Sequence, residues 1–268
     1  CSSLVSIPAF DLQRLTNEGS MFNGASNLTG WDSGIDFSSV TNANNMFYGC
    51  TSLQSLPSTA DFSSVTNGQS MFQGCTSLQS LPSTLSFASL TNGVRMFNSC
   101  STITSIPSSL GFANLTNGQS MFQQCSGLTS IPNTITFPSL TNGQSMFNQS
   151  GLSAAPTLTS ASLTNISNMF SYCYSLTTMP SITSTVISDC QAAFSWCRSM
   201  ASGIYSTYTQ LSSQATPPSS HASCFNRCGD QTQTGAEELA QIPTDWGGTY
   251  TPPSGGDDGG GIGVELED

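Results

Sequence analysis

The stretch that decides the fold is Ser64-Val-Thr-Asn-Gly-Gln-Ser-Met71-Phe72-Gln-Gly-Cys75-Thr-Ser-Leu78-Gln-Ser-Leu81-Pro82. Its Met-Phe pair recurs at 21–22, 46–47, 71–72, 96–97, 121–122, 146–147 and 169–170, and the first six copies are 25 residues apart. A fixed period of this size is the sequence signature of a solenoid, in which each coil buries its apolar side chains only against its neighbours. We therefore expect an α/β repeat solenoid of about ten coils of ~25 residues each.

Each coil contains three recurring units. Leu78, Leu81 and Pro82 represent a Leu-x-x-Leu/Ile-Pro unit that we expect to form one short strand, because proline cannot donate to a ladder beyond its end. The same unit appears last at 239–243. An asparagine such as Asn67 then follows in a Leu/Val-Thr-Asn triplet, where it can cap a short helical or 3₁₀ turn that carries the Met-Phe pair. Along the stack, these asparagines should form caps and amide ladders rather than a ligand-binding array.

The regular pattern predicts three segments. Residues 1–188 form the regular solenoid, which starts in mid-coil because Cys1 occupies the cysteine position of the repeat; we therefore expect the parent protein to be longer. Residues 189–250 are predicted to hold divergent terminal coils and a cap, with Trp246 and Tyr250 as lids. Within them, the irregular connection 203–222 offers Tyr205 and Tyr208 as a candidate binding loop. Residues 251–268 are a Gly/Asp-rich acidic tail of low intrinsic order.

Composition narrows the classes of partner. Charged residues make up 7% of the chain, and the net charge is −11. Arg95 is the only formal charge between Asp61 and Asp189. A surface of this kind lacks the basic footprint that nucleic acid or an anionic membrane requires. No run of 18 apolar residues is present, so the sequence predicts no spanning helix.

The cysteines fall into two groups. The first group shares one position of the repeat and should form an inward-facing structural ladder of free thiols: Cys1, Cys50, Cys75, Cys100, Cys125, Cys173 and Cys197. The second group lies off the ladder or near its end, and a cap disulfide could join two of its members: Cys190, Cys224 and Cys228. Zinc held by His221 with these cysteines is an alternative, although the spacing His-x₂-Cys-x₃-Cys is not a standard site, and we predict no metal.

The order Phe-x-x-Cys-x-Ser-Leu-x-Ser-Leu/Ile-Pro, followed by Leu-Thr-Asn and the next Met-Phe, resembles the BspA-like leucine-rich repeats of surface proteins. The resemblance covers residues 1 to about 200 and again 238–243. It implies a right-handed leucine-rich-repeat solenoid, displayed outside a cell or on a particle, that is used for attachment or protein contact. It supplies no catalytic residues.

Function is therefore sought on the surface. The strand side predicts a candidate binding face made of two rows: Gln54, Gln79, Thr104, Thr129, Ser153 and Thr177 in one, and Ser55, Ser80, Ser105 and Ser130 beside it. Regular hydroxyls and amides suit polar, uncharged ligands such as glycans, while a plain solvated face and an ice-binding surface are the alternatives. No nucleophile–base pair or cofactor motif emerges, so we expect no enzyme and no cofactor.

We expect a non-enzymatic attachment protein at the cell surface, outside the cell or on a virion. Its partners would be a host or neighbouring cell-surface protein or glycan, without nucleic acid and without membrane insertion. The alternative is a structural or decoration component of a virion or surface filament, with the other subunits of that assembly as partners.

Overall fold

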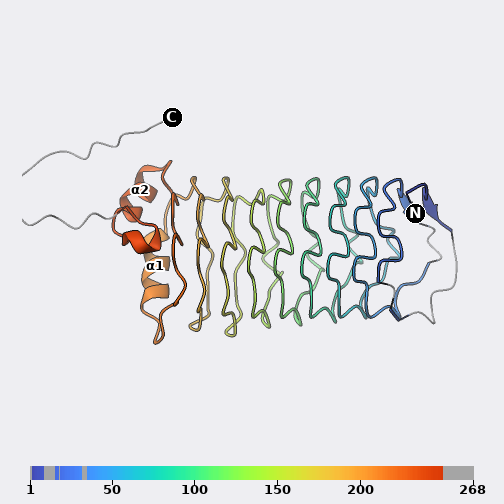
Figure 1. Ribbon diagram of the computed structural model, residues 1–268, viewed down its shortest axis with the longest axis horizontal. Coiled ribbons are helices and arrows are strands. Elements are labelled where there is room, and N and C mark those ends of the chain that lie inside the picture. The colour runs from blue at the N-terminus through green and yellow to red at the C-terminus, as the bar shows by residue number, and fades with distance from the viewer. Residues whose placement is uncertain (1, 9–15, 18, 32–34, 250–268) are drawn as a thin grey trace, which may run out of the picture.

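The computed structural model describes residues 2–8, 16–17, 19–31 and 35–249 as a stack of coils along one axis (Figure 1). Bridges along the asparagine row join nine successive coils through Asn17, Asn42, Asn67, Asn92, Asn117, Asn142, Asn165, Asp189 and Ser220. The repeat solenoid expected from the sequence is therefore present. Cys1, Tyr250 and the predicted tail 251–268 lie outside the described residues.

Extended strand structure is sparser than the sequence predicts. The only strands among the described residues are β1 (Ser6–Ile7) and β2 (Gly30–Trp31), which pair in parallel. On the same side of later coils, the pairing shrinks to isolated bridges such as Ser55 with Ser80 and Thr178 with Ser202. A proline closes most of these segments and has no N–H to donate, so the ladder cannot lengthen into a continuous sheet.

The Met-Phe segment is not helical, contrary to expectation. In the coil of Met71, the N–H of Met71 donates to Gly68 O (3.1 Å), whereas the N–H of Phe72 donates to Met96 O of the next coil (2.9 Å). Ser70 has a left-handed backbone with φ 53°, and Gly74 has φ 75°. A left-handed residue interrupts a right-handed helix, so the segment becomes a series of overlapping turns. Alternate N–H groups are thereby free to join neighbouring coils.

A column of phenylalanine rings fills the core. Rings from successive coils stack with centroids 5.4 to 5.8 Å apart and planes within 14° of parallel, along Phe47, Phe72, Phe97, Phe122, Phe147, Phe170 and Phe194. All these side chains are fully buried. The repeated apolar positions predicted from the sequence thus form one continuous core rather than separate small ones.

Three short helical segments lie at the C-terminal end: α1 (Ile204–Ser212), α2 (Gln233–Leu239) and the 3₁₀ turn η1 (Thr244–Trp246) (Figure 1). Phe225 continues the ring column beyond Phe194 at 5.6 Å, and Trp246 stacks on Phe225 at 6.4 Å. Trp246 therefore acts as the expected lid. Two predictions are wrong here, because 203–222 contains α1 instead of an irregular loop and 239–243 ends a helix instead of forming a strand.

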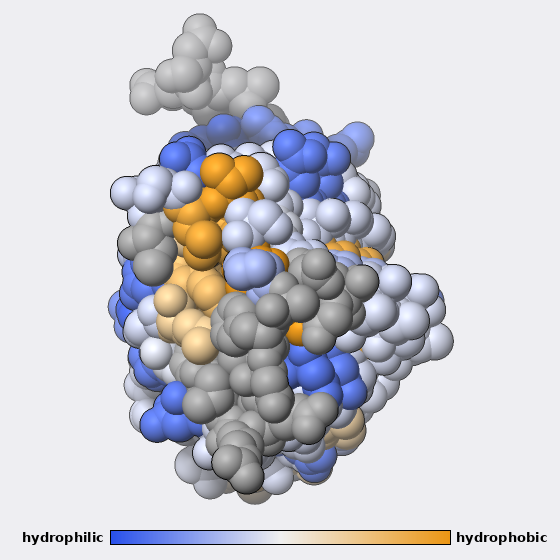
Figure 2. All heavy atoms as spheres, turned by 90° about the vertical axis from the view of Figure 1, so that its right-hand side faces the viewer, coloured by the Kyte–Doolittle hydropathy of each residue, from blue (hydrophilic) through white to orange (hydrophobic). Residues whose placement is uncertain are grey.

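The N-terminal end of the stack exposes apolar side chains. Figure 2 looks onto this end and shows a hydrophobic patch among polar side chains. Val5 in the coil of β1 is 58% exposed. In the described part of the chain, no helix is long and apolar enough to cross a membrane.

Candidate functional site

The ten residues of the predicted binding face are all exposed, and we refer to them as the polar face. Backbone hydrogen bonds between neighbouring coils fix their register beneath the polar face, for example from Gln79 N to Gln54 O (3.0 Å) and from Thr177 N to Ser153 O (3.1 Å). The hydroxyl of Thr177 also donates to Ser153 O at 3.0 Å. The polar face is therefore a rigid surface of uncharged side chains repeated at the spacing of the coils.

The asparagine row serves the scaffold, as predicted. Asn67 Nδ2 donates to Asn42 Oδ1 (3.0 Å), and Asn92 Nδ2 donates to Asn67 Oδ1 (3.0 Å). The Oδ1 atom of Asn67 also accepts the N–H of Gln69 at 3.2 Å. The amide ladder is therefore confirmed, although each asparagine caps a turn rather than a helix.

The predicted binding loop is replaced by a helix, so its two tyrosines differ in exposure. Tyr205 lies in the first turn of α1 and is 39% exposed. Tyr208 packs edge-on against Trp246, with centroids 5.3 Å apart and planes at 83°. Tyr205 therefore remains available to a ligand, whereas Tyr208 belongs to the cap.

The described ladder cysteines are buried and hydrogen-bonded across coils. Cys75 Sγ donates to Phe47 O (3.2 Å), and the same contact recurs from Cys50 to Cys197 at 3.0 to 3.3 Å. Burial raises the pKa of Cys50 to about 11 and that of Cys125 to about 12. These thiols therefore stay protonated at neutral pH and act as small apolar side chains with one donor.

The cysteines of the cap do not form the disulfide considered from the sequence. Cys190, Cys224 and Cys228 are buried free thiols, and Cys190 hydrogen-bonds to Cys224. Among the described residues, no group of three His, Cys, Asp or Glu side chains is arranged to hold a metal ion. His221 instead stacks on Trp246 at 4.3 Å, and its Nδ1 lies 2.9 Å from Pro218 O.

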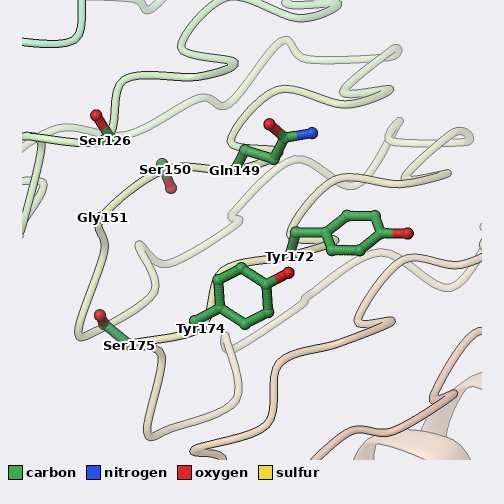
Figure 3. Close-up of a pocket in the computed structure, with 7 residues that line it drawn as sticks. All are labelled: Ser126, Gln149, Ser150, Gly151, Tyr172, Tyr174 and Ser175. Atoms are coloured by element: carbon green, nitrogen blue, oxygen red, sulfur yellow. The ribbon is translucent and has the colours of Figure 1, made fainter.

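A hollow of about 550 Å³ lies where the repeat is shortened, and the sequence interpretation missed it. Figure 3 shows the seven residues that line it, which come from three successive coils: Ser126, Gln149, Ser150, Gly151, Tyr172, Tyr174 and Ser175. Tyr172 is 38% exposed and Tyr174 is 53% exposed. We call this site the tyrosine hollow.

A deletion in the repeat explains the hollow. Leu128 lies three positions after Cys125, whereas Leu152 lies only two positions after the equivalent Ser150. The chain passes close to the preceding coil at Gly151, where an added Cβ would overlap the carbonyl oxygen of Ser126. The drop in the Met-Phe spacing to 23 residues was the available sequence signal. It could have indicated a gap in the surface, because the preceding coils keep a spacing of 25 residues.

Aromatic side chains continue from the hollow toward the C-terminal end. Tyr172 stacks on Trp196, with centroids 5.8 Å apart and planes within 19°. The guanidinium of Arg227 lies 4.5 Å from the Trp196 ring centroid and pairs with Asp230 at 2.8 Å. An aromatic strip therefore runs from the uncharged hollow to a charged cluster at the cap.

Comparison with known proteins places the chain in a family. The model of a family described as Mycoplasma protein of unknown function, DUF285, matches residues 3–110 and 57–160, which together span more than half of the chain. The chain belongs to the DUF285 family. A search for relatives among curated proteins returned no significant match.

Solved structures similar to this DUF285 chain are leucine-rich-repeat proteins. One from T. pallidum is 25% identical, with a TM-score of 0.33, over 64% of this chain and 66% of its own. One from Bacteroides ovatus is 17% identical (TM-score 0.34; 74% and 68% covered), and a leucine-rich cell surface protein from Faecalibacterium prausnitzii is 18% identical (TM-score 0.26; 74% and 72% covered). The chain thus spans just under two thirds of the T. pallidum protein. The expected resemblance to bacterial leucine-rich-repeat surface proteins is confirmed, and it assigns no ligand.

Proposed function

We propose that the protein is a non-enzymatic recognition scaffold, displayed outside a cell, that attaches to a polar, uncharged partner through its side surface. The observation that supports this most directly is the polar face, in which ten exposed uncharged residues repeat on a hydrogen-bonded backbone. Ordering such a surface costs little on binding, because the stack already fixes the backbone of each coil. Many equivalent weak contacts can then add up along the array.

The chemistry of the described residues favours binding over catalysis. The ladder thiols are protonated and buried, so they are poor nucleophiles. His221 directs Nδ1 at Pro218 O and Nε2 at Asp245 Oδ2 (3.3 Å) and stacks on Trp246. Both of its ring nitrogens thus face oxygen atoms of the cap, and neither is paired with a hydroxyl or thiol nucleophile.

Substitutions on two exposed rows test the proposal. Thr104→Lys with Thr129→Lys places two charges on the polar face, while Ala88→Lys with Ala113→Lys places two charges on an exposed row outside it without removing any side-chain hydrogen bond. Protein multimerised on beads would be applied to whole cells and to arrays of glycans and surface proteins. We expect the first pair to weaken binding at least about tenfold and the second pair to leave it nearly unchanged.

Two results would contradict the proposal. The first is a multimer that binds no cell, glycan or protein. The second is recovery of the chain at fixed stoichiometry with a particle or filament, combined with a failure to bind any external partner. That result would instead support the role of a structural spacer or decoration.

A further inference from the structure

We propose that the tyrosine hollow is a binding site for a neutral sugar, specifically a pyranose unit of an uncharged glycan. This inference rests on the proposed recognition function and adds to it a ligand class and a site outside the polar face. The hollow is continuous in sequence with that face, because Thr177 follows Tyr174 by three residues. A longer glycan bound in the hollow can therefore extend onto the rows of the polar face.

The two tyrosines provide the apolar part of the site. Their rings lie 6.1 Å apart at 69°, so they form a corner with two differently oriented aromatic faces. A pyranose ring has patches of C–H bonds on its faces and hydroxyls around its edge, which matches an amphipathic tyrosine better than an aliphatic side chain. Because Tyr174 is 53% exposed in the absence of a ligand, its ring is open to such stacking.

The polar groups around the corner suit the edge of a sugar. Gln149 is exposed, and its Oε1 accepts a hydrogen bond from Gln124 Nε2 (3.5 Å). The two amide hydrogens of Gln149 take no part in this bond and can donate to a ligand. Ser126 and Ser175 add exposed hydroxyls, each able to donate and accept. A volume of about 550 Å³ also lies within the range of ordinary small-molecule sites.

The lining contains no charged side chain, and this selects against anions. A carboxylate or sulfate entering the hollow would lose water without gaining a cationic partner. Arg198 and Arg227 share the carboxylate of Asp230 at the other end of the aromatic strip, so the positive charge that remains there lies beside Trp196 and outside the lining of the hollow. Neutral sugars should therefore bind in preference to sialylated or sulfated ones.

The backbone conformation at the hollow is shared with other coils. Gln149 and Tyr172 have left-handed backbones, with φ 58° and 61°, at a position that glycine occupies at Gly24, Gly49 and Gly74 and that other residues occupy at Ser99, Gln124, Trp196 and Arg227. Glycine adopts this conformation without penalty, whereas other residues incur a cost. The feature that distinguishes the hollow is therefore its pair of exposed tyrosines and not its backbone.

Variants that copy neighbouring coils test the site without changing the repeat. Tyr174→Ser introduces the residue found at the equivalent Ser126, and Tyr172→Gln introduces the residue found at Gln149. Tyr48→Ser is the matched control, because Tyr48 is 41% exposed in a coil near the N-terminal end. The probe is an array of neutral oligosaccharides of glucose, galactose, mannose and their N-acetylated forms, with sialylated and sulfated versions, exposed to the multimerised full chain.

We expect the wild type and the Tyr48 variant to bind neutral oligosaccharides equally and each hollow variant to bind them at least about tenfold more weakly. Circular dichroism and thermal unfolding would show that all four proteins are folded alike. Equal binding by the wild type and both hollow variants would overturn the assignment, and so would binding of anionic glycans only. Binding to cells or surface proteins without any binding to neutral glycans would also overturn it while leaving the proposed recognition function intact. Absence of all binding would overturn both.

Discussion

The stacked phenylalanine column should make stability depend on contacts between adjacent coils, and paired substitutions can measure this dependence. Phe97 is fully buried, and its ring stacks on Phe72 at 5.5 Å and 8° and on Phe122 at 5.4 Å and 5°. It also meets the ring of Phe87 edge-on at 6.4 Å and 77°. Leucine in its place keeps an apolar side chain but removes all three ring pairs. Since each pair contributes about 0.5–1.5 kcal/mol beyond burial, we expect Phe97→Leu to lower the free energy of unfolding by about 1.5–4.5 kcal/mol.

The double variant shows whether the effect is local. Phe97→Leu and Phe122→Leu each remove the ring pair between these two residues, and that pair can be lost only once. The double variant should therefore lose about 0.5–1.5 kcal/mol less unfolding free energy than the sum of the losses in the two single variants. Phe97 and Phe170 share no ring contact, since Phe122 and Phe147 lie between them in the column. The effects of that pair should add within about 0.3–0.5 kcal/mol.

Urea unfolding followed by far-ultraviolet circular dichroism provides the measurement. The dependence of the unfolding free energy on urea must be the same for all variants, because a changed slope would mean that the array no longer unfolds as one unit. The nearest-neighbour reasoning would be refuted if the adjacent pair showed no coupling. It would equally be refuted if the distant pair were coupled as strongly as the adjacent one.

The backbone, the thiols and the shortened coil each give one further prediction. Gln124 has φ 61°, so Gln124→Gly should raise the free energy of unfolding by about 0.5–1 kcal/mol in urea titrations, and a loss of stability would contradict the strain argument. Burial raises the pKa of Cys50 and Cys173 to about 11, so the folded state keeps protons that the unfolded chain releases above about pH 8.5. The free energy of unfolding should therefore be unaffected by these thiols below pH 8 and decline between about pH 9 and 11, and it should decline less in Cys50→Ala. Gly151→Ala should cost about 1–3 kcal/mol because its Cβ would overlap a carbonyl of the preceding coil, whereas Gly111→Ala, with open space around it, should lie within about 0.5 kcal/mol of the wild type in thermal unfolding.

The solenoid could be predicted from the sequence because its core residues recur at a fixed interval. Met96, Phe97 and Cys100 are all buried, as their positions in the repeat require. The conformation of the segment that carries them was not predicted correctly. An asparagine cap followed by four or five residues fits either one helical turn or overlapping turns, and the left-handed backbone of Arg95 decides between the two. The left-handed conformation of this arginine cannot be predicted from side-chain preferences, because it accompanies a backbone hydrogen bond from Arg95 N to Gln119 O of the next coil (2.9 Å).

The cap shows a different limit of sequence interpretation. Trp246 was expected to close the core, since a large aromatic residue is needed where the column ends. Helix α1 was missed, because Tyr205 and its neighbours lie in a serine- and threonine-rich stretch with weak helical preference. Glu238 explains why a helix forms there: its carboxylate accepts the N–H groups of Gly203 (3.2 Å) and Tyr205 (2.9 Å). A contact between residues more than thirty positions apart cannot be inferred from local propensity.

Regularity itself is an ambiguous guide to function in a repeat protein. A threonine precedes the ladder asparagine in every regular coil, as Thr66 does. Its hydroxyl donates to the preceding coil, from Thr66 to Thr41 O (3.2 Å), so stacking alone is sufficient to explain this row of threonines. Tyr172 and Tyr174 have no such explanation, since stacking would be served equally by the glycine, serine or threonine found at their positions in other coils. Residues that repeat thus indicate what the scaffold requires, while large exposed residues that break the repeat indicate a requirement other than stacking. On this reasoning, we expect substitutions in the tyrosine hollow to change the choice of ligand more than substitutions in the regular rows, which the arrays described above would measure.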